Sequence, residues 1–200
     1  MSAPSLELAP APTTEALADR IVAVFDRCFA SPRGLNTRLR GGFDEPYYRP
    51  ATEGRPAHEE LRYHRVEFTR DYAASALHEA AHWCVAGAAR RQLPDYGYWY
   101  APDGRSEEQQ AEFERVEVKP QALEWIFARA SGLRFRVSAD NLESGLGPSD
   151  SFKRAIWQQV RDNCRQGVNE RAATFARALA AEFGRPDPLD PALYQLAELA

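Results

Sequence analysis

Residues 72–84 read YAASALHEAAHWC, and this alanine-rich run carries the strongest structural signal in the chain. Alanine has the highest helix propensity of all residues, and further alanines continue to residue 89. We therefore predict a helix over residues 72–91. So many small side chains also let neighbouring backbones approach closely, which is typical of a helix at the centre of a domain.

His78 and His82 lie four residues apart within this predicted helix. Residues at that spacing share one helix face, so both imidazoles can bind one metal ion. The HExxH pattern on a helix is a strong metalloenzyme signal, and the chain contains only four histidines. We predict a metalloenzyme in which Glu79 is the general base of a hydrolase, or orients a ligand or moves a proton in an oxygenase.

A third protein ligand must come from outside this run. A metzincin would need glycine at position 85 and histidine at position 88, where the chain has Val85 and Ala88, so that class is excluded. The other two histidines, His58 and His64, precede the predicted helix, in a loop and a strand. A carboxylate that follows the helix is therefore the favoured third ligand.

The segment FERVEVKPQ, at residues 113–121, provides candidate carboxylates. Glu117 stands between two valines, just before a helix start expected at Pro120, and a carboxylate among apolar neighbours needs a buried partner. We predict Glu117 as the third ligand. Glu114 fits a solvated helix position better, and Glu124 is the weakest candidate of the three.

Two histidines and one carboxylate leave coordination positions free for a substrate. This set is found in non-haem Fe(II) oxygenases and also in zinc hydrolases. The ligand types alone do not choose between iron and zinc, so an oxygenase and a hydrolase, either peptidase or nuclease, both stay open. A third possibility is a non-catalytic adaptor with a vestigial metal site, against which the intact HExxH residues argue.

The remaining sequence predicts an α+β fold dominated by helices, with a small sheet. Hydrophobic periodicity and capping signals predict helices over residues 14–30, 106–115, 120–132, 150–166, 169–183 and 190–199. Alternating apolar residues predict strands over residues 61–69 and 133–137. Residues 33–60 show no clear period, which indicates a long loop.

Composition limits the class of protein. A length of 200 residues suggests one domain, over residues 13–200, after a disordered tail at residues 1–12 that contains three prolines. The net charge of −4 predicts neither direct nucleic-acid binding nor a polybasic membrane anchor. There is no secretory signal and no apolar run near the roughly 20 residues that span a bilayer. Because three scattered cysteines form no disulfide framework, we expect a soluble cytoplasmic protein.

The chain also resembles the elongation factor P hydroxylases over residues 14–185. The matching strings, in chain order, are NTRL at 36–39, DEP at 44–46, the run at 72–84, GYWY at 97–100, PDGR at 102–105, VEVKPQAL at 116–123 and DNLE at 140–143. The chain departs from the family pattern at its proline-rich N-terminus and at residues 49–61, where it is longer.

The resemblance implies an enzyme that hydroxylates the β-lysyl-lysine side chain of elongation factor P, a tRNA-shaped translation factor. It also implies a fold similar to that of a metal-dependent bacterial endoribonuclease of rRNA maturation. The family's two-histidine, one-carboxylate site corresponds here to His78, His82 and Glu117, which would hold Fe(II) for chemistry with dioxygen. No 2-oxoglutarate motif is evident, so the electron donor stays open.

A lysine-like substrate calls for aromatic rings that can hold a cation over a ring face and for carboxylates that can pair with an ammonium group. Two predicted loops provide both kinds of side chain. The candidates are Tyr96, Tyr98, Trp99, Tyr100, Asp103, Asp140 and Glu143. Among these, Tyr98, Tyr100, Asp103 and Asp140 are the predicted substrate contacts.

Overall fold

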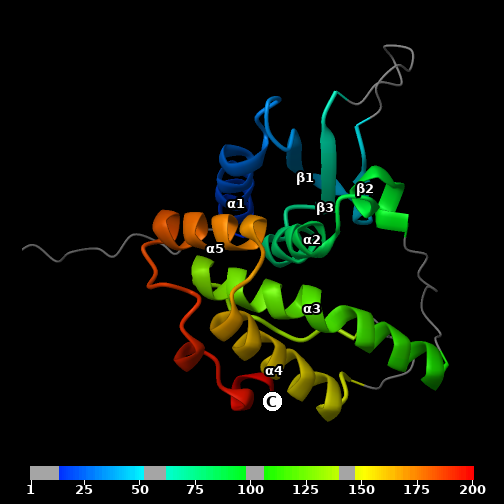
Figure 1. The fold of residues 1–200 in the computed structure, drawn as a ribbon, viewed down its shortest axis with the longest axis vertical. Coiled ribbons are helices and arrows are strands. Elements are labelled where there is room, and N and C mark those ends of the chain that lie inside the picture. Colours follow the sequence, from blue (N-terminus) through cyan, green and yellow to red (C-terminus); the bar gives the residue numbers. More distant parts are fainter. Residues whose placement is uncertain (1–13, 52–61, 98–105, 140–146) are drawn as a thin grey trace, which may run out of the picture.

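The computed structural model describes residues 14–51, 62–97, 106–139 and 147–200 (Figure 1). Within these ranges the chain forms five α-helices and a three-stranded sheet, which confirms the predicted helix-dominated α+β fold. The helices are α1 (Thr14–Phe29), α2 (Ala73–Val85), α3 (Glu107–Ser131), α4 (Asp150–Gln166) and α5 (Glu170–Phe183). The strands are β1 (Thr37–Phe43), β2 (Tyr47–Arg49) and β3 (His64–Thr69). The predicted tail at residues 1–12 lies outside the described residues.

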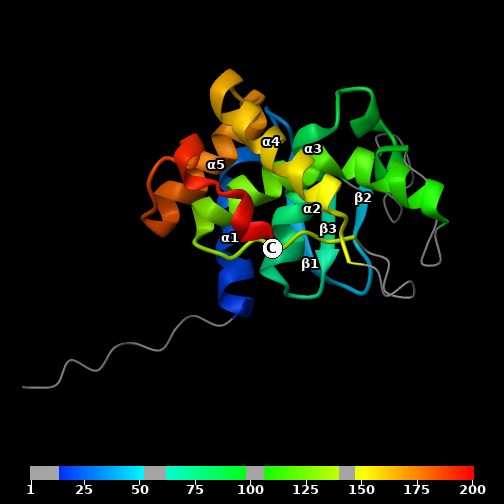
Figure 2. The same cartoon turned by 90° about the horizontal axis from the view of Figure 1, so that it is seen from below.

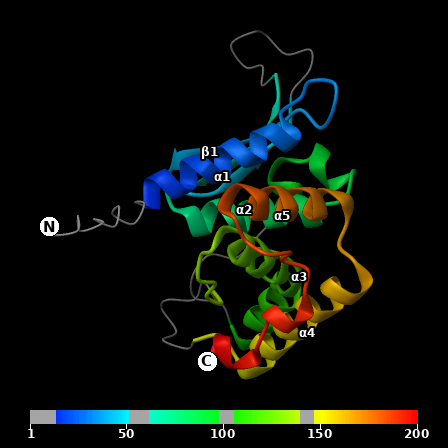
Figure 3. The same ribbon diagram turned by 90° about the vertical axis from the view of Figure 1, so that its left-hand side faces the viewer.

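The elements stack with α2 near the middle (Figures 1 and 3). The sheet and α1 lie at one end, α2 and α5 come next, then α3, and α4 lies at the other end. α2 contacts α1, α3, α5 and the sheet. Its buried residues are mostly small: Ala73, Ala76, Leu77, Ala80, Ala81, Trp83 and Cys84. The alanine-rich run is therefore the central helix that its composition predicted.

β3 is the central strand of the sheet, which has the order β1-β3-β2. It pairs in parallel with β1 and antiparallel with β2. Val66 of β3 lies opposite both Leu39 and Tyr48, and all three are buried. The predicted strand at residues 61–69 is confirmed, but the prediction of a loop over 33–60 was wrong at β1 and β2. Arginines at alternate positions of β1 (Arg38, Arg40) left only one strongly apolar residue to mark its buried side.

α3 is one continuous helix, where we predicted a short helix, a break and a second helix. The capping box of Ser106 and Gln109 begins it as expected, and Gly132, with a φ of 71°, ends it. Pro120 lies inside the helix, where proline typically costs about 3 kcal/mol. Buried side chains on both sides of the proline, including Phe113 and Ile126, favour the continuous helix, so tertiary packing overrides the local preference.

Two further predictions were wrong. Residues 133–137 pair with no strand in the described parts of the chain. The C-terminal segment forms two short 3-10 turns, Pro191–Leu193 and Leu196–Leu199, in place of one helix. These turns pack against α4 (Figure 2), where the indole Nε1 of Trp157 donates to the Tyr194 carbonyl at 3.1 Å.

The helices predicted at 14–30, 150–166 and 169–183 are confirmed as α1, α4 and α5. None of the helices in the described ranges has the length and apolar character needed to cross a membrane.

α2 ends at Val85 and not at residue 91, because Ala86 leaves the helical conformation with a ψ of 124°. Side chains from elsewhere satisfy the carbonyls that the helix end leaves free. The Arg171 guanidinium of α5 donates to the carbonyls of Cys84 at 2.9 Å and Ala86 at 2.8 Å. Arg91, from the 3-10 turn Arg90–Gln92, donates to the Ala86 carbonyl at 2.7 Å. Cations at a helix C-terminus also interact favourably with its dipole.

Replacing Arg171 by methionine is expected to lower the free energy of unfolding by about 2–3 kcal/mol, because hydrogen bonds from a charged donor to two carbonyls are lost. Urea denaturation measures the change. Arg177→Met is the matched control, since Arg177 is exposed on the same helix. Equal unfolding midpoints for the two variants would show that Arg171 does not hold the end of α2.

Candidate metal centre

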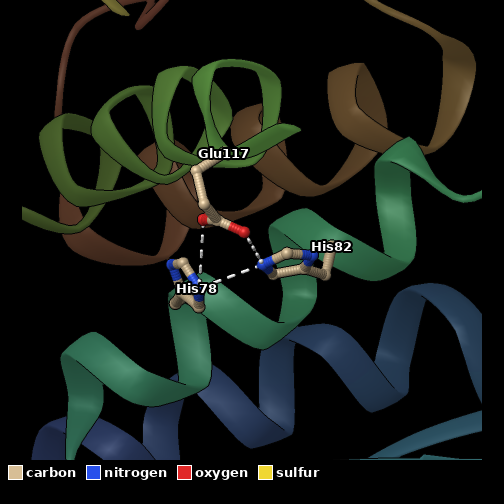
Figure 4. Close-up of side chains that lie close together, drawn as sticks. All are labelled: His78, His82 and Glu117. Carbon is tan, nitrogen blue, oxygen red and sulfur yellow. Dashed lines mark hydrogen bonds and ion pairs between the residues drawn. The ribbon is translucent and has the colours of Figure 1, made fainter. Parts of the chain in front are cut away.

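Three side chains from α2 and α3 point at one another (Figure 4). The Nε2 atoms of His78 and His82 are 3.0 Å apart. The Glu117 carboxylate of α3 lies 3.2 Å from His82 Nε2 and 3.7 Å from His78 Nε2. One ligand atom of each residue lies within 4.8 Å of the others. The structure thus brings together the three residues that sequence reasoning selected as ligands.

The geometry of His78 supports metal binding at this group. Its Nδ1 lies 2.8 Å from the Glu124 carboxylate. Because a carboxylate oxygen accepts hydrogen bonds, the contact fixes Nδ1 as the atom that donates to Glu124 and leaves Nε2 as the ring nitrogen directed at His82 and Glu117. A second hydrogen bond that orients a histidine in this way is usual for metal ligands. Two nitrogens and one carboxylate oxygen form a donor set that fits Fe(II) or Zn(II).

The charges of the group suit a cation. Burial alone would raise the pKa of Glu117, but the imidazoles of His82 and His78 hold it at about 2, so Glu117 is an anion. Burial lowers the pKa of His78, and the carboxylates of Glu124 and Glu117 more than compensate, so the net shift is upward. A metal ion that binds here must displace protons from the imidazoles, as is general for histidine sites.

The structure gives different contacts to the three carboxylates that the sequence offered as candidates for the third ligand. Glu117 is 2% exposed and faces the histidines. Glu124, the weakest candidate as a ligand, orients His78 from the other side of the ring. Glu114 accepts a hydrogen bond from the Ser149 hydroxyl at 2.6 Å, and it therefore ties α3 to the start of α4. The role of Glu124 could not be predicted from residue spacing, because Glu124 and His78 lie on different helices and meet only in the folded structure.

A cavity of about 580 Å³ opens beside the three residues. Glu79 lines it together with the three candidate ligands, and burial raises the pKa of the Glu79 carboxyl. Asp95 and Tyr96 also line it. Tyr96 was one of the aromatic residues expected at a substrate pocket, whereas sequence reasoning missed Asp95. Tyr98, Tyr100, Asp103 and Asp140, the predicted substrate contacts, lie outside the described residues, as do Trp99 and Glu143.

Gln121 is a buried residue of the site that sequence reasoning missed. Its side-chain amide donates to the Ser138 carbonyl at 2.8 Å and accepts from the Ser138 backbone N–H at 3.2 Å. The same nitrogen donates to Glu117 at 3.4 Å. Gln121 therefore couples the segment that follows α3 to the carboxylate of the candidate metal centre.

Glu124→Gln is expected to weaken metal binding by about 10- to 100-fold, the usual effect of losing a partner that orients a histidine ligand. Glutamine keeps the size of the side chain but removes the charge that stabilises a metal-bound His78. Titration of the metal-free protein with Fe(II) under nitrogen measures the affinity. Glu108→Gln, at an exposed position of the same helix, is the control, and equal affinities for the two variants would contradict the role of Glu124.

Two histidines and a glutamate on packed helices, beside an open cavity, are typical of a metal-dependent enzyme. The sequence comparisons supply the family. The sequence model of the elongation factor P hydroxylase family matches residues 24–194. A curated relative, elongation factor P lysine hydroxylase of Haemophilus influenzae, is 48% identical over 176 residues, which cover 88% of this chain and 94% of the relative. The chain therefore belongs to the elongation factor P hydroxylase family.

Proposed function

We propose that this chain is an Fe(II)-dependent hydroxylase that acts on the β-lysyl-lysine side chain of elongation factor P. The observation that carries the proposal is the convergence of His78, His82 and Glu117 beside a cavity, in a chain of this family. The relative's name supports a lysine of elongation factor P as the target. We further propose that residues 13–200 act as one domain in the cytoplasm, with a fold similar to that of the rRNA-maturation endoribonuclease.

His78, His82 and Glu117 would hold the metal ion. When bound, Fe(II) supplies the activation of dioxygen that acid-base side chains cannot provide, and it requires an electron donor whose identity stays open. Glu124 keeps the ring of His78 in position through its Nδ1. Gln121 restrains the carboxylate of Glu117 through its side-chain amide. These contacts fix the ligands before the substrate arrives, which is the arrangement that a precise metal site needs.

Glu79 is the candidate residue for proton transfer. Its carboxyl lines the cavity next to the ligands. Because burial raises its pKa, it can take up and release a proton closer to neutral pH than an exposed glutamate. We propose that Glu79 receives or supplies protons at its carboxyl oxygens while the substrate occupies the cavity.

A zinc hydrolase is the second candidate, because the HExxH string and the same donor set also fit zinc. In that case Glu79 would act as a general base on water. The two candidates differ in the metal and in the need for dioxygen, so both can be tested with one preparation of metal-free protein.

The test is to load the metal-free protein with Fe(II) or with Zn(II) and incubate each form with β-lysylated elongation factor P. With a chemical reductant such as ascorbate present as the electron donor, we expect the intact mass of the factor to rise by one oxygen atom with iron, in air only, and not with iron-treated His78→Ala. A zinc-loaded protein that is fully active without dioxygen would favour the hydrolase. No change in mass with iron under air would contradict the proposed function.

A further inference from the structure

Two carboxylates in the cavity are not used by the candidate metal centre. Glu79 and Asp95 both line the cavity, and neither belongs to the group that could hold the ion. Among the described residues, no arginine or lysine forms an ion pair with either of them. Both residues are half-buried.

Tyr96 provides an independent observation at the same place. Tyr96 also lines the cavity, is 3% exposed, and its hydroxyl is buried without a hydrogen-bond partner in the described parts of the chain. Its ring stacks on Tyr48, with centroids 4.3 Å apart. A buried hydroxyl that lacks a partner is unusual in a native structure, and a donor that reached the Tyr96 oxygen from the cavity would satisfy it.

The ligand that would satisfy all three side chains is a cation with several N–H donors. A primary ammonium group can donate to the two carboxylates and to the Tyr96 oxygen, and its charge offsets theirs. Arg136 is the only arginine or lysine among the described residues that line the cavity, and it is exposed. The Tyr48 backbone already gives Asp95 one hydrogen bond, but a neutral substrate side chain would bring no opposite charge to either carboxylate, and a mismatch of this kind at buried polar groups is a strong source of specificity.

We infer that Asp95, together with Glu79 and the Tyr96 hydroxyl, forms the subsite that binds an ammonium group of the lysine-derived substrate. The inference rests on the proposed function for the identity of that substrate. Asp95 is the specificity-determining residue, because Glu79 lies beside the ligands and also serves the chemistry. Asp95 and Tyr96 both have left-handed backbone conformations, with φ of 46° and 55°, and the Arg90 guanidinium donates to the Tyr96 carbonyl at 3.1 Å.

The test compares two forms of elongation factor P prepared by semisynthesis, one with free amines on the modified lysine and one with those amines acetylated. Wild-type protein is expected to prefer the free-amine form. Asp95→Asn is expected to lower kcat/KM for that form by about 10- to 100-fold, mainly through KM, because a hydrogen bond between two charged groups is lost. Its kcat/KM for the acetylated form should change little, so the preference disappears.

Two more variants distinguish the loss of the ammonium subsite from misfolding of the protein. Asparagine tolerates the left-handed conformation, and Asp95→Gly, which also permits it, should lose the same preference. Tyr96→Phe is expected to weaken the preference by about 2- to 10-fold, as for one neutral hydrogen bond. Asp19→Asn, at an exposed position of α1, should behave as wild type. An equal loss on both substrates, or an unchanged preference in Asp95→Asn, would overturn the inference.

Binding separates this inference from the proposed function. Calorimetry with metal-free protein measures the affinity for the two forms of the factor without any turnover. If the wild type binds the free-amine form more tightly and Asp95→Asn does not, the ammonium subsite stands even when no hydroxylated product is found. If product forms and Asp95→Asn keeps the binding preference, the hydroxylase stands and the subsite is wrong.

Discussion

His82→Ala is expected to abolish hydroxylation and to remove stoichiometric metal binding, while the far-ultraviolet circular dichroism of the protein stays close to that of the wild type. His82 Nε2 lies 3.0 Å from His78 Nε2 and 3.2 Å from the Glu117 carboxylate, so it is the atom closest to both other ligands. Two donors from protein do not hold a divalent ion tightly. We expect the affinity to fall by more than the roughly 10- to 100-fold that loss of an orienting partner produces.

The His82→Ala variant also tests how much His82 stabilises the buried Glu117 carboxylate in the metal-free protein. Without His82 the buried Glu117 carboxylate loses its nearest partner, which typically costs about 1–3 kcal/mol. Metal content by mass spectrometry, turnover and urea denaturation are measured together. His64→Ala is the comparison, because His64 lies on β3 and pairs with Tyr48 and not with the cavity. Full activity in His82→Ala, or equal metal loss in both variants, would contradict the assignment.

Glu117→Gln has the second largest expected effect, because it removes the anion of the site without changing its shape. Among two neutral imidazoles and one carboxylate, the carboxylate is the only ligand that offsets the charge of a divalent cation, and this offset is lost when the carboxylate becomes an amide. We expect metal affinity to fall by more than about 100-fold and hydroxylation to be lost. Fe(II) titration under nitrogen and the mass assay of the factor measure the two effects.

Glu114→Gln is the matched variant for this prediction, since Glu114 lies one turn earlier on α3 and bonds to Ser149 instead of the histidines. It should retain the metal and lose only stability, through the contact between α3 and α4. The opposite pattern, with metal lost in Glu114→Gln and kept in Glu117→Gln, would show that the candidate site has been built on the wrong carboxylate.

The central helix and its histidine pair could be predicted from sequence, because both depend on residues close together in the chain. Alanine propensity located α2, and the four-residue spacing placed His78 and His82 on one face. Glu117 could be predicted because its apolar neighbours made a solvated position unfavourable. These signals are local, and they needed no knowledge of how α2 and α3 pack.

The parts that could not be predicted depend on tertiary contacts. Glu124 orients His78 across two helices, and no spacing rule joins them. Asp95 reaches the cavity from a turn with a left-handed backbone, and the sequence at that position signals only a loop. The continuous α3 shows the same limit, since packing around Pro120 overrides a strong local preference. β1 could not be recognised because Leu39 is the only strongly apolar residue among its buried positions and arginines flank it on both sides.

The origin of the oxygen atom in the product tests the proposed iron-dependent hydroxylation most directly. Iron-loaded protein and a chemical reductant are incubated with β-lysylated elongation factor P in ordinary water under dioxygen labelled with a heavy isotope, and the modified residue is weighed by mass spectrometry. A hydroxylase with its metal on His78, His82 and Glu117 predicts that the added atom carries the label. An added atom taken from water, or a reaction that proceeds without dioxygen, would contradict hydroxylation by a metal ion at this site.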